Sequence, residues 1–110
     1  QQLSNFVVGT EDAVDWFTSA RNPFARWWDS RPDRRPSTPG RTTKLAIIGH
    51  SLGAAAVSKV QATDRRVAAV VALDKLAADG SFAPGTSTGP NRPVVPALAV
   101  QSEYGFTVTP

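Results

Sequence analysis

The sequence predicts an α/β protein built on a parallel, doubly wound β-sheet, with about three strands and two helices. Three apolar runs of strand length alternate with a helix-compatible segment and with a long segment rich in glycine and proline. The first run passes into the helix-compatible segment through a very short turn that contains two glycines. This alternation is typical of βαβ units, in which consecutive strands run parallel.

The first predicted element is a short helix over residues 10–20. Thr10 is a suitable N-cap, and Glu11 and Asp12 would then lie in the first turn, where negative charge interacts favourably with the helix dipole. Apolar residues follow at helical spacing. Pro23 ends the predicted helix, because the residue before a proline is already extended.

A basic connection follows the first helix. Between Arg21 and Arg41 the chain carries six arginines against two aspartates, whereas the whole protein has a net charge of only +3, so the rest of the chain is close to neutral. Four prolines in the connection allow at most a short helical turn around its tryptophans. Such a basic segment can attract an anionic partner, but it says nothing about the fold.

The next three elements are a strand, a helix and a strand. Residues 45–48 form an uninterrupted apolar run, typical of a strand buried on both faces. Residues 51–61 are small and helix-compatible, and a polar segment closes this helix. Residues 67–73 form a second apolar run with β-branched side chains at three positions, which favours a second buried strand.

The last predicted element is a third strand over residues 94–100. Pro96 is tolerable there only at the start of the strand or at an edge of the sheet. Residues 80–96 contain too many glycines and prolines for a helix and predict a loop. We therefore divide residues 1–110, as one partial domain, into the helix before the first strand (1–22), the basic connection (23–43) and the strands with their helix (44–110).

Residues 49–53, Gly-His-Ser-Leu-Gly, form a G-x-S-x-G motif where the first strand meets its helix. A serine at such a sharp turn has a strained backbone that lifts its Oγ clear of the sheet. Strand and helix approach so closely there that we expect Gly49 and Gly53 to be required. The Leu52 N–H, at the start of the helix, would point toward an oxyanion. The alternative is an ordinary tight turn in which Ser51 caps the helix.

Residues 45–56, Leu-Ala-Ile-Ile-Gly-His-Ser-Leu-Gly-Ala-Ala-Ala, resemble the elbow strand, nucleophile elbow and following helix of the α/β-hydrolase family, in particular its esterases, lipases and cutinase-like polyesterases. The similarity extends to the helix before the elbow strand and to the next two strands. The resemblance implies that Ser51 is the nucleophile that attacks a carboxylic ester and that the Leu52 N–H is half of the oxyanion hole. We expect no cofactor and no metal. The residues leave the localisation open, and only the resemblance makes a secreted protein plausible.

The resemblance leaves two candidates for the catalytic acid. The family usually places the acid after the strand matched by residues 94–100, which favours Glu103, although Gly105 stands where an aspartate is expected. Some members place the acid after the preceding strand, which would select Asp74. Each carboxylate also has an ordinary explanation, as a solvated loop residue for Glu103 and as an ion-pair partner for Asp74.

The catalytic base is missing from the pattern. His50 is the only histidine, and as the residue before the nucleophile we expect it to project away from the Ser51 hydroxyl. The family has its histidine after the acid and its second oxyanion donor well before the elbow. We therefore expect this chain to be the nucleophile-bearing part of a longer protein, completed by the remaining segments of the hydrolase domain.

Two alternatives remain open, a non-catalytic relative of the hydrolases and a basic, aromatic module that binds anions or nucleic acid. The module would use Phe24, Arg26, Trp27, Trp28, Arg31, Arg34 and Arg35. A proline-rich connection that covers a sheet edge has the same composition, so we do not expect nucleic acid as a partner.

Composition excludes several classes of protein. With 41% hydrophobic and 19% charged residues the chain is globular, and no apolar run approaches the length of about 20 residues that crosses a bilayer. The lack of cysteine excludes thiolate metal sites. A sheet of only three parallel strands would leave one edge and much of one face unburied.

Overall fold

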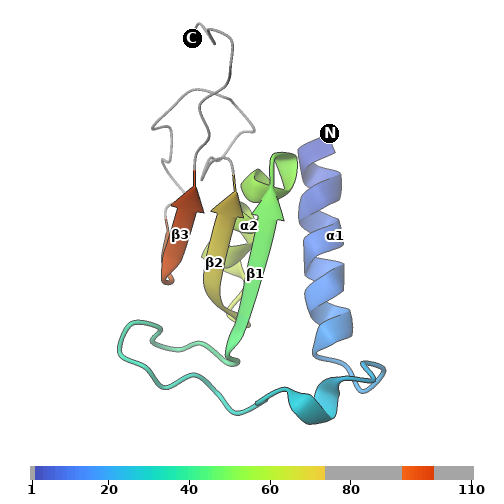
Figure 1. Cartoon of the computed structure of the whole chain (residues 1–110), viewed down its shortest axis with the longest axis vertical. Coiled ribbons are helices and arrows are strands. Elements are labelled where there is room, and N and C mark those ends of the chain that lie inside the picture. The colour runs from blue at the N-terminus through green and yellow to red at the C-terminus, as the bar shows by residue number, and fades with distance from the viewer. Residues whose placement is uncertain (1, 74–92, 101–110) are drawn as a thin grey trace, which may run out of the picture.

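The computed structural model describes residues 2–73 and 93–100 (Figure 1). The elements in chain order are α1 (Gln2–Phe17), the 3₁₀ turn η1 (Ala25–Trp27), β1 (Leu45–His50), α2 (Leu52–Thr63), β2 (Val67–Leu73) and β3 (Ala97–Val100). The strands are parallel and lie in the order β1-β2-β3. Within the described residues this is a small α/β fold with two α-helices, as the sequence predicts.

Helix α1 begins earlier than predicted, so the proposed N-cap at Thr10 is wrong. Thr10 lies inside the helix, and its hydroxyl donates to the Phe6 carbonyl at 2.7 Å, which satisfies the side chain without ending the helix. Leu3, Val7 and Val14 lie at helical spacing and are partly or fully buried. Because this apolar stripe continues toward the amino terminus, the helix continues with it.

Helix α1 also ends before Pro23, because a buried asparagine supplies the turn. The Asn22 side chain donates to the Phe17 carbonyl at 2.8 Å and accepts from the Phe24 N–H at 2.9 Å. The first bond satisfies one of the carbonyls left free at the end of the helix. The short turn expected around the tryptophans is present as η1.

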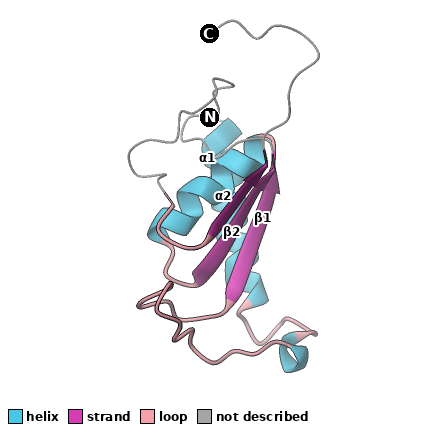
Figure 2. Ribbon diagram, turned by 60° about the vertical axis from the view of Figure 1, so that its left-hand side comes forward, coloured by secondary structure: helices cyan, strands magenta, loops and turns pink. Residues whose placement is uncertain are grey.

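Helix α2 packs against α1, β1 and β2, and both helices lie on one side of the sheet (Figure 2). A doubly wound sheet has helices on both faces, so the described residues do not show the predicted doubly wound arrangement. Two valine clusters form the core. Val14, Val60 and Val67 join α1, α2 and β2, and Val57, Val70 and Val95 join α2, β2 and the segment before β3. Ile47 of β1 packs against both clusters.

Helix α2 is buried on nearly all sides. Residues 54–56 are consecutive alanines with no exposed surface, so neighbouring elements approach the helix closely. The buried hydroxyl of Ser58 donates to the Ala54 carbonyl at 2.6 Å. The buried Gln61 side chain accepts from the Val94 N–H at 3.0 Å and so fixes the segment that leads into β3. These bonds satisfy polar groups that would otherwise be costly to bury.

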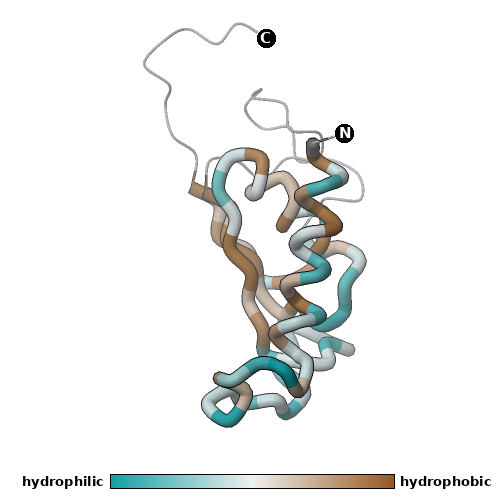
Figure 3. The backbone as a smooth tube through the Cα atoms, turned by 90° about the vertical axis from the view of Figure 1, so that its right-hand side faces the viewer, coloured by the Kyte–Doolittle hydropathy of each residue, from teal (hydrophilic) through white to brown (hydrophobic). Residues whose placement is uncertain are grey.

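Strand β1 is not buried on both faces, contrary to the prediction. Its residues alternate between half-buried and exposed, and Ile48 is 64% exposed. Ile48 aligns with Val71 of β2, which aligns with Leu98 of β3, and Leu98 is 58% exposed. No described element covers this apolar row, and the strands are mostly coloured hydrophobic in Figure 3. The prediction that three strands leave one face unburied is confirmed.

Strand β3 begins directly after Pro96, at one edge of the sheet, where the sequence predicts this proline to be tolerated. The Pro96 carbonyl accepts from the Val70 N–H at 3.0 Å. Most of the predicted loop over residues 80–96 lies outside the described residues. In the described part of the chain, no helix is both long and apolar enough to cross a bilayer.

Candidate active site

Ser51 is the residue between the end of β1 and the start of α2. Its backbone has φ 57° and ψ −121°, and Ser51 is the one non-glycine residue with positive φ among the described residues. Such a conformation costs about 1–3 kcal/mol and persists only where the surrounding structure enforces it. The strained strand-to-helix turn that the motif predicts is therefore present.

Backbone hydrogen bonds hold the Ser51 turn, without a capping bond from the Ser51 side chain. The Ser51 N–H donates to the Leu73 carbonyl at 3.1 Å, which joins the turn to the end of β2. The Ser51 carbonyl accepts from the Ala54 N–H at 2.9 Å at the start of α2. The Ser51 hydroxyl makes no capping bond. The part of the alternative in which the Ser51 side chain caps the helix is therefore wrong.

Gly49 is where strand and helix touch. A Cβ added to Gly49 would lie 2.2 Å from the Gly53 carbonyl oxygen and 2.5 Å from its carbon, so only glycine fits. A Cβ added to Gly53 would meet nothing within 4 Å. The requirement for glycine is thus confirmed at Gly49 and wrong at Gly53, because it is the Gly53 backbone that makes the contact.

The Leu52 N–H is available at the start of α2. The backbone hydrogen bonds at this end of the helix run from Ala54 and Ala55 to the Ser51 carbonyl. Within the described residues no backbone acceptor is bonded to the Leu52 N–H. Free amides at the amino end of a helix carry partial positive charge, which stabilises an anion placed there.

The carboxyl ends of the three strands form one row. His50 aligns with Leu73 of β2, and Leu73 aligns with Val100 of β3. His50 is exposed and shares its face of the sheet with Ile48. The two candidate acids follow this row in the chain, Asp74 directly after Leu73 and Glu103 shortly after Val100. Both acids lie outside the described residues, so their assignment stays a prediction.

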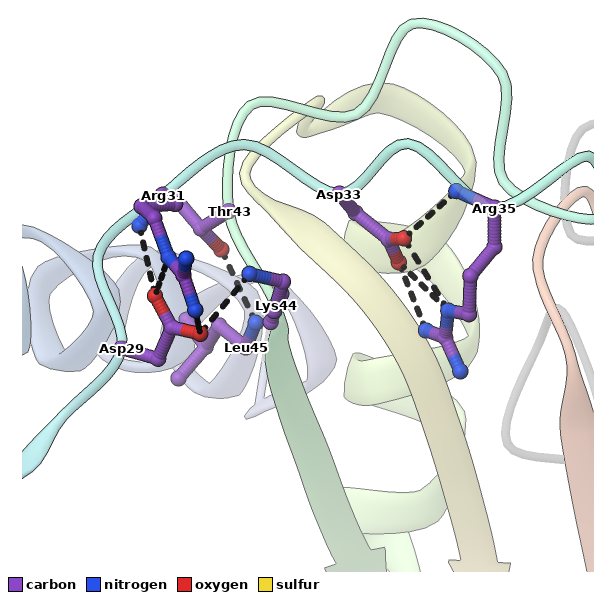
Figure 4. Close-up of polar contacts among 7 residues, drawn as sticks. All are labelled: Asp29, Arg31, Asp33, Arg35, Thr43, Lys44 and Leu45. Carbon is purple, nitrogen blue, oxygen red and sulfur yellow. Dashed lines mark hydrogen bonds and ion pairs between the residues drawn. The ribbon is translucent and has the colours of Figure 1, made fainter.

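The sequence analysis missed a repeated contact at the opposite end of the sheet, which we call the Asp-x-Arg clamp. In each clamp an aspartate accepts from the backbone N–H and the guanidinium of the arginine two residues later. The clamps are Asp29 with Arg31, Asp33 with Arg35, and Asp64 with Arg66. Figure 4 shows the first two. The repeated spacing D-x-R is the signal in the sequence from which the clamps could have been predicted.

The clamps neutralise much of the basic connection. The guanidiniums of Arg31 and Arg35 hold the pKa of the Asp29 and Asp33 carboxyls well below the usual range. Asp29 also accepts from the Lys44 ammonium at 2.9 Å, which fastens the connection to the start of β1 (Figure 4). The local charge counted from the sequence therefore overstates what an anionic partner would meet.

Neither a metal site nor a similar protein identifies the function of Ser51. Among residues 2–73 and 93–100, no group of three or more His, Cys, Asp or Glu side chains could hold a metal ion. Comparisons with models of known protein families, with curated proteins and with solved structures found no match. Any function assigned to Ser51 therefore rests on the contacts described above.

Proposed function

We propose that this chain is the nucleophile-bearing part of a serine hydrolase of the α/β-hydrolase type, which cleaves carboxylic esters through a Ser51 acyl-enzyme. The strained backbone of Ser51 carries the proposal. A turn that only linked a strand to a helix would gain nothing from strain at a residue other than glycine, and its serine would cap the helix. Here the Ser51 hydroxyl caps nothing.

The chemistry follows from what surrounds Ser51. Its Oγ attacks the ester carbonyl carbon and gives its proton to a general base, and the carbonyl oxygen becomes an oxyanion. The Leu52 N–H donates to that oxyanion. Collapse of the intermediate breaks the bond to the alcohol, which leaves with the proton from the base. Water then gives a proton to the base and attacks the acyl carbon, the bond from that carbon to Ser51 Oγ breaks, and Oγ takes the proton from the base as the carboxylic acid leaves.

The partners of Ser51 in this mechanism are proposals of their own. The acid is Glu103, with Asp74 as the alternative, since each follows a strand that ends in the same row as β1. We assign the base to a histidine in the remainder of a longer protein, because His50 lies on the exposed face of β1 next to Ile48. The second oxyanion donor has the same origin.

Labelling with a fluorophosphonate tests the proposal in the natural protein that contains these residues. We expect one covalent label, located on Ser51 by peptide mass spectrometry. Ser51→Ala should lose the label, and Ser30→Ala, which changes an exposed serine of the connection, should keep it. A folded protein that takes up no label, or takes it up elsewhere, would contradict the proposal and favour a non-catalytic relative.

The same assay separates the two candidate acids. The acid orients the base and stabilises its protonated form, so its removal slows labelling by a large factor. Glu103→Gln and Asp74→Asn are matched changes that remove one negative charge each. The acid is the residue whose change slows labelling, and the other variant should label at the normal rate.

A further inference from the structure

A cavity of about 640 Å³ lies at the amino ends of the strands, at the opposite end of β1 from Ser51. It is lined by Arg31, Pro32, Asp33, Arg34, Arg35 and Lys44. Four of these six side chains are cationic and one is anionic. Figure 4 labels the lining residues Arg31, Asp33, Arg35 and Lys44, and the hydrophilic connection stands out in Figure 3.

The carboxylates near the cavity are already engaged. Asp33 accepts from the Arg35 backbone and guanidinium, and its side chain is only 1% exposed. Asp29, beside the cavity, accepts from Arg31 and from Lys44. Two carboxylates therefore face four cations, and an excess of positive charge remains for a ligand.

The arginines keep donors free. Arg31 and Arg35 each bind their own aspartate through Nε and one terminal nitrogen, and in the described part of the chain the other terminal nitrogen of each has no partner. Arg34 lies between them, exposed, and its guanidinium has no partner among the described residues. Since the clamps already fix two guanidiniums, an anion that binds them orders few additional side chains.

The other arginines nearby do not extend this positive surface into a track. The Arg26 guanidinium lies 4.5 Å from the centre of the Trp27 ring. Arg41 donates to the Asp64 carbonyl, and Arg65 donates to the Gly40 carbonyl. Four cations thus line one cavity, an arrangement that fits a compact anion better than a long polyanion.

We propose that this cavity binds a single phosphate group, as inorganic phosphate or a phosphate monoester. The guanidinium fork of Arg34 matches the oxygens of phosphate, and the remaining terminal nitrogens of Arg31 and Arg35 each add a single donor. The Lys44 ammonium, which is bonded to Asp29, adds a point charge. The site is separate from Ser51 and does not depend on the proposed esterase activity. Arg34 is the lining arginine whose guanidinium has no partner in the part of the chain that the structure describes, so it can turn to the ligand.

Isothermal titration calorimetry tests the phosphate site, with inorganic phosphate and phenyl phosphate as probes in separate titrations. We expect saturable binding of at least one of them, weakened about tenfold by Arg34→Gln, the loss typical of one hydrogen bond between charged groups. Arg21→Gln is the matched control, because Arg21 is exposed, belongs to the same basic region and does not line the cavity. If phenyl phosphate binds and inorganic phosphate does not, the ligand is a phosphate monoester.

Three outcomes would overturn the phosphate site. One is the absence of saturable heat with either probe at about 10 mM, where even weak specific sites fill. Another is an equal loss of affinity in Arg34→Gln and Arg21→Gln, which would indicate diffuse attraction by net charge. The third is binding only of a single-stranded oligonucleotide, with affinity that rises with its length, which would indicate a polyanion surface.

Discussion

The two ends of the sheet are held by different forces. At the carboxyl end, the path of the chain is set by backbone contact, because Gly49 touches Gly53 and Ser51 takes a strained conformation. At the amino end, the path is set by charged side chains, as in the clamps of Asp29 and Asp33. A tight steric contact leaves almost no room for a larger side chain, and its contribution to stability does not depend on salt or pH, whereas the contribution of an ion pair depends on both. Three substitutions, each with a control variant, test this contrast.

The largest effect is expected for Gly49→Ala. The new methyl group would lie 2.2 Å from the Gly53 carbonyl oxygen, so the backbone of β1 or α2 has to move. We expect the free energy of unfolding to fall by about 3 kcal/mol, the upper part of the range for overpacking a tight site. Urea unfolding monitored by circular dichroism measures it.

Gly53→Ala is the control for that substitution. An added Cβ there meets nothing within 4 Å, and alanine is favoured over glycine inside a helix by about 1 kcal/mol. We therefore expect Gly53→Ala to leave stability unchanged or to raise it. Equal destabilisation by the two variants would show that the close contact between strand and helix is not what fixes the turn.

A smaller effect, of opposite sign, is expected for Ser51→Gly. Glycine adopts positive φ without the cost that Ser51 bears, so the variant should gain about 1 kcal/mol after allowance for the greater freedom of glycine in the unfolded chain. For a chain of this size that is a rise in Tm of about 5 °C. Differential scanning calorimetry measures it. Ser51→Ala keeps the Cβ, and a gain in Tm as large as that of Ser51→Gly would argue against strain.

The elements near the turn were predictable because short-range patterns decide them. β2 was predicted at its observed bounds, and α2 follows its small residues as expected. Thr10 misled the prediction of α1, since a threonine hydroxyl is equally satisfied by a carbonyl within the helix. The prediction that Gly53 must be glycine was also wrong, because only one of the two glycines in the motif lacks room for a Cβ. Which of two approaching backbones lacks room depends on their orientation in space, which the sequence does not encode locally.

The amino end of the sheet was predicted least well, because the prediction counted the net charge of the basic connection and did not consider ion pairs within it. Six arginines suggested a surface open to anions, yet Arg31 and Arg35 are committed to Asp29 and Asp33. The two-residue spacing recurs at Asp64, beside the start of β2. An aspartate two residues before an arginine in an irregular segment can bind both its backbone N–H and its guanidinium, and this local geometry is readable from sequence once it is recognised.

The smallest effect is expected for Asp29→Asn, and it should depend on pH. The Arg31 guanidinium, with Lys44, holds the pKa of Asp29 well below the ordinary value of about 3.9 in the folded state. The folded protein therefore keeps this carboxylate ionised while the unfolded chain takes up a proton, so the stabilisation is complete above about pH 4 and is lost as the pH falls below it. The difference in unfolding free energy between wild type and Asp29→Asn should shrink between about pH 4 and pH 2.

Salt should weaken the Asp29 clamp more than the Asp33 clamp. The Asp29 side chain is 41% exposed and that of Asp33 only 1%, so dissolved ions screen the first pair more strongly. Urea unfolding at pH 7 in low salt and in about 1 M NaCl measures this difference. At about 1 M NaCl charges are screened within about 3 Å, so the effect of Asp29→Asn on the free energy of unfolding should shrink, whereas most of the effect of Asp33→Asn should remain. Equal sensitivity of the two variants to salt would mean that burial does not distinguish the clamps. The amino end of the sheet would then be held by net charge alone, and the fixed guanidiniums on which the phosphate site depends would lose their support.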